Sequence, residues 1–141
     1  MKKFSIFLIL LLSFTLVGGA GDVTVVPTID YANYGDFDGD GFEDDVYINV
    51  TIDLSGANVY NFQYILTLTL PSGLFYTYQY TIVTDSNLVL HHYLMDHATE
   101  PGWYDVDVDI TMKTGGISTA HAEYIFDPPG GGSNGGSPDG S

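Results

Sequence analysis

The sequence predicts an all-β protein, an antiparallel β-sandwich of about seven strands. Apolar side chains recur at every second position through most of residues 22–127, and no segment shows helical periodicity. Short clusters of Gly, Pro, Asn, Asp and Ser separate these alternating segments. Many short strands with regular turn signals between them are the pattern of two antiparallel sheets packed face to face.

Each expected strand has its own signal. The first, 23–31, contains Pro27, whose missing N–H argues for a position at a sheet edge. The second, 45–54, alternates aliphatic and polar residues without interruption. The other five are expected within 59–70, 74–83, 88–95, 103–112 and 119–127, with turns at Pro71-Ser72-Gly73, Asp85-Ser86-Asn87 and Gly115-Gly116.

Residues 1–21 have the order of a secretory signal peptide. Two lysines precede an apolar stretch from Phe4 to Val17, and small residues follow it up to an expected cleavage after Ala20 or Gly21. The apolar stretch is about 14 residues long, shorter than the roughly 20 that a membrane-spanning helix needs. We therefore expect a secreted protein of the extracellular space or cell surface, with no membrane segment after cleavage.

The rest of the chain divides into two parts. Residues 22–127 contain all the alternating segments and form the expected folded domain. Residues 128–141, PPGGGSNGGSPDGS, offer no apolar side chain to bury, and we expect a flexible Gly/Ser/Pro-rich tail.

The mature protein is strongly acidic. After the expected cleavage, Lys113 is the single basic residue of the Lys/Arg type against 18 carboxylates, a formal charge of −17. Such a surface repels nucleic acid and anionic lipid and attracts divalent cations. The chain has no cysteine, so disulfides cannot hold its loops.

The most informative segment is residues 35–45, GDFDGDGFEDD. Carboxylates at alternate positions, a glycine and a further carboxylate form the pattern D-x-D-x-D-G-x-x-D, which begins at Asp36. Calcium takes six to eight oxygen ligands, and a tightly wound loop can supply them from one short segment. Gly41 permits the sharp turn and Gly39 eases it. The expected ligands are the side chains of Asp36, Asp38, Asp40, Asp44 and Asp45 and the backbone carbonyl of Phe42. An acidic turn without an ion is the alternative.

This motif resembles the calcium loops of EF-hands, dockerins, thrombospondin type 3 repeats and FG-GAP repeats. It departs from an EF-hand because Tyr47 occupies the position of the bidentate Glu and a strand follows the loop. The resemblance implies that Asp44 or Asp45 replaces that Glu. The motif occurs once, so it predicts neither a propeller nor a repeat array.

A second resemblance concerns the segment DHATEPGWYDVDV. It is similar to the corner that precedes the sixth strand of immunoglobulin-like domains, where Asp-x-Ala/Gly comes before a Tyr. Asp96, Ala98 and Tyr104 match these places, although extra residues separate Ala98 from Tyr104 and the Cys-Trp-Cys core is missing. The resemblance implies an Ig-like architecture and not antibody-type recognition.

Other clusters of ligand-type residues carry weaker signals. His91 and His92 would point to opposite faces of a strand, so a zinc site that includes both and His97 is disfavoured. Alternating aspartates at 105, 107 and 109 are expected to form a solvated strand face, with cation binding or a glycosidase-type pair as alternatives. There is no G-x-S-x-G, no HExxH and no cysteine, and we expect no enzymatic activity.

Aromatic residues suggest a further possibility. Five tyrosines of the central segments either fill the core, which is the default, or form a platform for sugars or a partner subunit: Tyr60, Tyr64, Tyr76, Tyr78 and Tyr80.

The function expected from the sequence is that of a secreted, calcium-stabilised structural or adhesive domain of a cell surface or extracellular matrix. One alternative is a filament subunit that donates residues 22–34 as a strand to a neighbour. Another is a carbohydrate-binding module. The expected partners are a second copy of the chain or an extracellular protein or glycan. If the host glycosylates, Asn49 in Asn-Val-Thr is the best acceptor.

Overall fold

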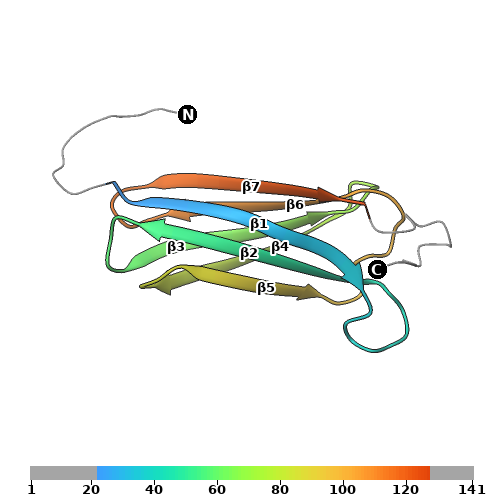
Figure 1. Ribbon diagram of the computed structural model, residues 1–141. Helices are drawn as coiled ribbons and strands as arrows, with labels where there is room; N and C mark the ends of the chain where they lie inside the picture. Colours follow the sequence, from blue (N-terminus) through green and yellow to red (C-terminus); the bar gives the residue numbers. More distant parts are fainter. Residues whose placement is uncertain (1–21, 128–141) are drawn as a thin grey trace.

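The computed structural model describes residues 22–127, so the expected signal peptide and the tail lie outside the described residues. It contains seven strands in two antiparallel sheets, which confirms the predicted sandwich (Figure 1). No helix in this range has the length and apolar character required to cross a membrane.

One sheet has three strands in the order β1-β2-β5, and the other has four in the order β4-β3-β6-β7. The strands are β1 (Thr24–Gly35), β2 (Asp45–Ser55), β3 (Tyr60–Thr69), β4 (Phe75–Thr84), β5 (Leu88–Leu94), β6 (Tyr104–Met112) and β7 (Ser118–Phe126). Every neighbouring pair is antiparallel.

The hydrophobic core lies between the three central strands β2, β3 and β6. Their inward side chains are fully or almost fully buried, because each strand alternates apolar and polar residues in phase with the pleat. These residues are Val46, Ile48, Val50, Ile52, Tyr60, Phe62, Tyr64, Leu66, Leu68, Tyr104, Val106, Val108, Ile110 and Met112.

The two open sides of the sandwich differ. On one side β1 packs against β7 (Figure 1), and β1 carries Pro27 and a register shift between Ile29 and Tyr31. The expected edge position of Pro27 is therefore confirmed. On the other side β4 and β5 are the last strands of their sheets, and neither pairs with a further strand.

The strand order brings two distant segments together at one end of the molecule. Because β2 and β5 are antiparallel, Val46 at the start of β2 pairs with Leu94 at the end of β5. The loop between β1 and β2 therefore lies against the segment between β5 and β6. A hydrogen bond from the Ala98 amide to the Asp44 carbonyl, 2.8 Å long, joins the two.

Candidate metal site at the acidic loop

The loop between β1 and β2 winds around the carboxylate of Asp36. Its Oδ1 accepts hydrogen bonds from the amides of Gly39 and Asp40, at 2.8 and 3.2 Å, and its Oδ2 accepts one from Gly41 at 3.0 Å. Gly39 and Gly41 have φ angles of 78° and 93°, in the region that favours glycine. The open space at both glycines shows that the backbone angle, and not crowding, calls for glycine.

Two further aspartates continue the same winding. The Asp40 amide donates to Asp38 Oδ1 at 3.1 Å, and the Phe42 amide donates to Asp40 Oδ1 at 2.9 Å. Each of these bonds joins a side chain to the backbone two residues later, which is the local turn that Asp favours. The alternation of aspartates in the sequence is thus the reason for the shape of the loop.

Asp45 anchors the loop to the rest of the fold. Its carboxylate is fully buried and accepts amide hydrogen bonds from Phe37 at 2.7 Å, Asp38 at 2.9 Å and Asp96 at 2.8 Å. Burial raises the pKa of Asp45, but the three amides outweigh it and hold that pKa below its ordinary value. A single ionised carboxylate therefore connects the loop, the start of β2 and the segment after β5.

Asp96 is the site residue that sequence reasoning missed. It is the one described non-glycine residue with a positive φ, 61°. Its carboxylate lies with those of Asp38 and Asp45 in one group that could hold a metal ion, and with those of Asp40 and Asp44 in another. The available signal was topological, because antiparallel pairing of β2 with β5 places Asp96 beside the loop.

The electrostatics of the loop show crowded negative charge. A hydrogen bond from the Asp40 backbone lowers the pKa of Asp38, yet desolvation and the charges of Asp40 and Asp45 raise it to about 6. Burial, with the charges of Asp40, Asp96 and Asp45, also raises the pKa of Asp44. The Oδ1 atom of Asp44 is buried and has no hydrogen-bond partner. A cation among these groups would relieve the repulsion and satisfy this orphaned oxygen.

The structure distributes the expected ligands over overlapping groups. Asp36, Asp38 and Asp40 form one group. Asp96 forms a second group with Asp38 and Asp45, and a third with Asp40 and Asp44. Phe42, expected to contribute its carbonyl, has a side chain that is 68% exposed. Several carboxylates here could hold a metal ion, and Asp96 is a member of two of the three groups.

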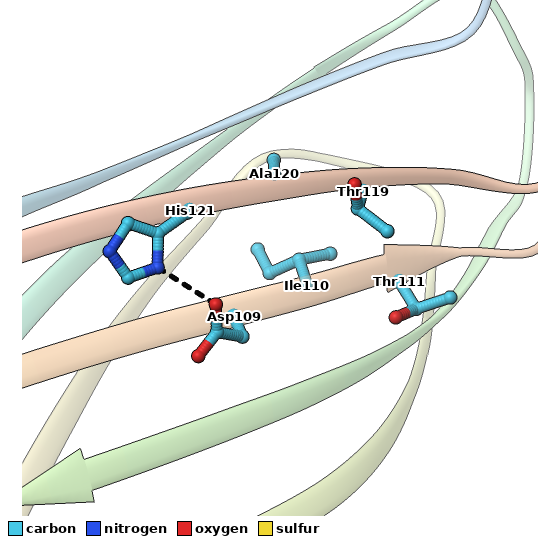
Figure 2. Close-up of a pocket in the computed structure, with 6 residues that line it drawn as sticks. All are labelled: Asp109, Ile110, Thr111, Thr119, Ala120 and His121. Atoms are coloured by element: carbon cyan, nitrogen blue, oxygen red, sulfur yellow. Dashed lines mark hydrogen bonds and ion pairs between the residues drawn. The ribbon is translucent and has the colours of Figure 1, made fainter. Parts of the chain in front are cut away.

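A second acidic group lies on the outer face of the four-stranded sheet. Asp105, Asp107 and Glu123 of β6 and β7 also stand close enough to share an ion. Burial, the hydrogen bond with Glu123 and nearby charges raise the pKa of Asp105 to about 6. His121 lies 3.3 Å from Asp107 and 2.8 Å from Asp109 (Figure 2), so a cationic imidazole can balance part of this charge. This group lacks the wound backbone of the loop.

The outer face of the three-stranded sheet carries an aromatic cluster that the sequence reasoning did not identify. It comprises Tyr31, Phe37, Tyr47, His91 and Tyr93. The Tyr47 and Tyr93 rings lie 5.0 Å apart, and the Tyr47 hydroxyl lies 2.8 Å from His91 Nδ1. Phe37 belongs to the acidic loop, and its ring lies 5.9 Å from that of Tyr93. The cluster and the candidate metal site are therefore contiguous.

A shallow cavity of about 400 Å³ joins the cluster to the loop. Aromatic rings and polar side chains line it together, among them Tyr31, Phe37, Tyr47, Asn33, Asp36 and Glu43. Apolar rings beside convergent polar groups are typical of sites for small polar ligands.

The tyrosines singled out in the sequence lie elsewhere. Tyr60 and Tyr64 are buried in the core, and Tyr76 and Tyr78 are partly buried against it. Tyr80, 43% exposed, faces the gap between β4 and β5. These rings form the core and one open side, which fits the default reading of the aromatic segments.

The three neighbouring histidines also separate. His91 contacts Tyr47 on the outer face of β5, and His92 lies 2.8 Å from the Tyr64 hydroxyl on the inner face. His97 lies after the strand has ended, with its ring tilted against that of Tyr76 and the centroids 4.4 Å apart. None of the described carboxylate groups that could hold a metal includes a histidine.

Asn49, the expected glycosylation acceptor, and Tyr104, at the corner before β6, lie outside the metal site. Asn49 lies in β2, opposite Tyr31 and His91, and its buried Oδ1 has no hydrogen-bond partner. The Tyr104 hydroxyl donates to the Glu100 carbonyl at 2.6 Å and accepts from the Glu100 amide at 3.0 Å. These two hydrogen bonds tie the start of β6 to the segment that precedes it.

Comparison with known proteins gave no match to a protein-family model, a curated protein or a solved structure.

Proposed function

We propose that this protein is a calcium-stabilised structural or adhesive β-sandwich of the extracellular space. The observation that carries the proposal is the hydrogen-bonded winding of the acidic loop, with the Asp44 oxygen that lacks a partner inside it. The donors are all carboxylates, and an oxygen-only set of this kind suits a hard cation such as Ca²⁺. The ion would join the β1–β2 loop to Asp96 and fix that end of the sandwich.

The proposal includes a specific ligand assignment. Asp38, Asp40, Asp44 and Asp96 are the side chains whose charges are least balanced, since Asp45 is already occupied by three backbone amides. Asp36 likewise holds three loop amides, so its main contribution is to shape the loop. The carboxylate of Asp96, which lies outside the loop sequence, would take the place that a bidentate Glu has in an EF-hand.

Thermal unfolding with calcium and with chelator tests the proposal. An ion that binds only the folded state at 100 times its Kd adds about 2.7 kcal/mol of stability. For a domain of this size that corresponds to a rise in Tm of roughly 10–20 °C. Asp40→Ala and Asp96→Asn should remove most of the rise, whereas Asp53→Ala, an exposed aspartate of β2 outside the loop, should retain it. Superimposable curves for the unmodified protein would reject calcium binding.

The aromatic cluster supports carbohydrate binding as a second candidate. Its cavity combines exposed rings with amide and carboxylate groups, the set that a neutral sugar needs for stacking and hydroxyl hydrogen bonds. Titration with a panel of neutral oligosaccharides, followed by NMR shifts, tests this. Tyr31→Ala should weaken binding about tenfold or more, given the area that such a ring buries, and Tyr80→Ala should not. Equal effects of the two variants would exclude the cluster as the site.

The donated-strand alternative has less support than the calcium-stabilised domain. Residues 24–35 form β1 and pair with β2 of the same chain along its whole length. Donation to a neighbour requires an open groove that this segment leaves unfilled in its own chain. The pairing of β1 in its own sheet therefore favours the first candidate over a filament built by donating residues 22–34.

A further inference from the structure

The side of the sandwich formed by β4 and β5 lacks the features that usually protect a sheet edge. Natural edge strands carry charges, prolines or bulges that prevent pairing with another chain. Neither β4, FYTYQYTIVT, nor β5, LVLHHYL, contains a Lys, Arg, Asp, Glu or Pro. In a chain with 18 acidic residues, these two strands carry no fixed charge, and the turn between them holds a single carboxylate, Asp85.

The opposite side shows each protective feature. There β1 carries Pro27, the register shift at Asp30 and the exposed carboxylate of that residue. Its neighbour β7 carries the exposed Glu123. The β1–β7 side thus carries features that prevent pairing with another strand, and the β4–β5 side does not.

Apolar side chains are exposed along the β4–β5 side. Phe75 and Val83 of β4 are 62% and 64% exposed, and Val89 of β5 is 55% exposed. Most inward residues of both strands are only partly buried or exposed, because no further strand covers the gap between the two sheets; Leu94, at the end of β5, is buried. A cavity of about 360 Å³, lined in part by Tyr80 and Leu90, lies in this gap.

We propose that the β4–β5 side is an interface with a second copy of this chain. Two molecules of such high negative charge repel one another, and the approach is least unfavourable where both present uncharged strands. A two-fold axis perpendicular to the sheets would set β4 against β4 and β5 against β5, each pair antiparallel. One self-complementary contact would then extend both sheets and cover both sets of unpaired backbone groups.

The proposal does not depend on an ion in the acidic loop or on the release of β1. The edge strand β1 lies at the far end of the three-stranded sheet from β5. Substitutions on the two edges therefore separate this interface from a donated first strand.

Sedimentation velocity over a range of concentrations, on the 141-residue chain kept in calcium, tests the interface. The chain offers two matched pairs of variants that each add one negative charge. Val89→Glu on β5 is compared with Val26→Glu on β1, where the valines are 55% and 54% exposed. Gln79→Glu on β4 is compared with Gln63→Glu on the interior strand β3, on the same outer face.

The unmodified protein should form a dimer in a concentration-dependent manner. Val89→Glu and Gln79→Glu should each raise the dissociation constant at least tenfold, and their two controls should change it less than twofold. Far-ultraviolet circular dichroism verifies that each variant is folded, and the nearly isosteric Gln79→Glu keeps the test available if Val89→Glu unfolds. A protein that stays monomeric at every concentration, or a Val26→Glu effect as large as that of Val89→Glu, would overturn the proposal.

Discussion

Replacement of Asp45 by alanine should destabilise the fold more than any other single change in the acidic loop. The side chain is fully buried and accepts three backbone hydrogen bonds, from Phe37, Asp38 and Asp96. A hydrogen bond to a charged group contributes about 1.5–3 kcal/mol, and the three donors share one carboxylate. Since such contributions are not fully additive, we expect a loss of roughly 3–6 kcal/mol. Domains of this kind have about 5–15 kcal/mol in total.

Urea unfolding in the presence of chelator measures this loss without any contribution from a bound ion. Asp53→Ala is the control, since Asp53 is exposed and lies in the same strand; it should change the free energy of unfolding by about 0.5 kcal/mol or less. Asp45→Asn should fall between the two, because it keeps the shape and one acceptor oxygen. If Asp45→Ala lies within about 1 kcal/mol of Asp53→Ala, the anchoring role assigned to this carboxylate is wrong.

The pH dependence provides an independent check of the same residue. The folded-state pKa of Asp45 lies below its ordinary value of 3.8. Its contribution is therefore present in full above that value and is lost as the pH falls through the folded-state pKa. The part of the stability difference between the unmodified protein and Asp45→Asn that comes from the Asp45 carboxylate should shrink as the pH falls below 3.8. Near pH 6 the same difference also contains the titration of Asp38, whose pKa the Asp45 charge raises.

Three further predictions concern titration and the corner before β6. The Tm difference between calcium and chelator should be smaller at pH 5 than at pH 7.5, because Asp38, with a pKa of about 6, takes up a proton that competes with the ion; an unchanged difference would exclude Asp38 as a ligand. Burial and the nearby His91 lower the pKa of His92 from 6.5 to about 4, so its contribution to stability, complete above pH 6.5, should be lost as the pH falls toward 4. In His92→Phe the fall in stability between pH 6.5 and pH 4 should be smaller than in the unmodified protein, and an unchanged slope would assign that fall to other groups. Tyr104→Phe should cost about 1–3 kcal/mol in urea unfolding, because it leaves the Glu100 carbonyl without its donor, and a neutral result would mean that water replaces the hydroxyl.

The fold class could be predicted from the sequence because the alternation of apolar residues along each strand is local information. In β2, β3 and β6 the apolar residues alternate so regularly that the sequence alone separates the buried face from the exposed one. The first strand was expected to end at Tyr31 but continues to Gly35. The irregularity next to Ile29 interrupts the alternation there, and the period of two resumes at Ala32 in a changed phase.

The candidate metal site could be predicted from the sequence only in part. The loop from Asp36 to Asp45 is local, so its motif and its two glycines could be recognised along the chain. Asp96 could not, because it lies 51 residues from Asp45 and reaches the loop only through the pairing of β2 with β5. Composition also gave no distinction between buried tyrosines such as Tyr64 and exposed ones such as Tyr93.

The position of Phe37 has a thermodynamic consequence. Its amide is held by Asp45 within the acidic loop, while its ring contacts Tyr47 and Tyr93 in the aromatic cluster. Any event that displaces this residue changes both the acidic loop and the aromatic cluster. An ion in the loop and a ligand on the rings would then change each other's affinity by the same factor, whichever binds first. Near-ultraviolet circular dichroism of the tyrosines would therefore report the binding of an ion that does not itself absorb in that range.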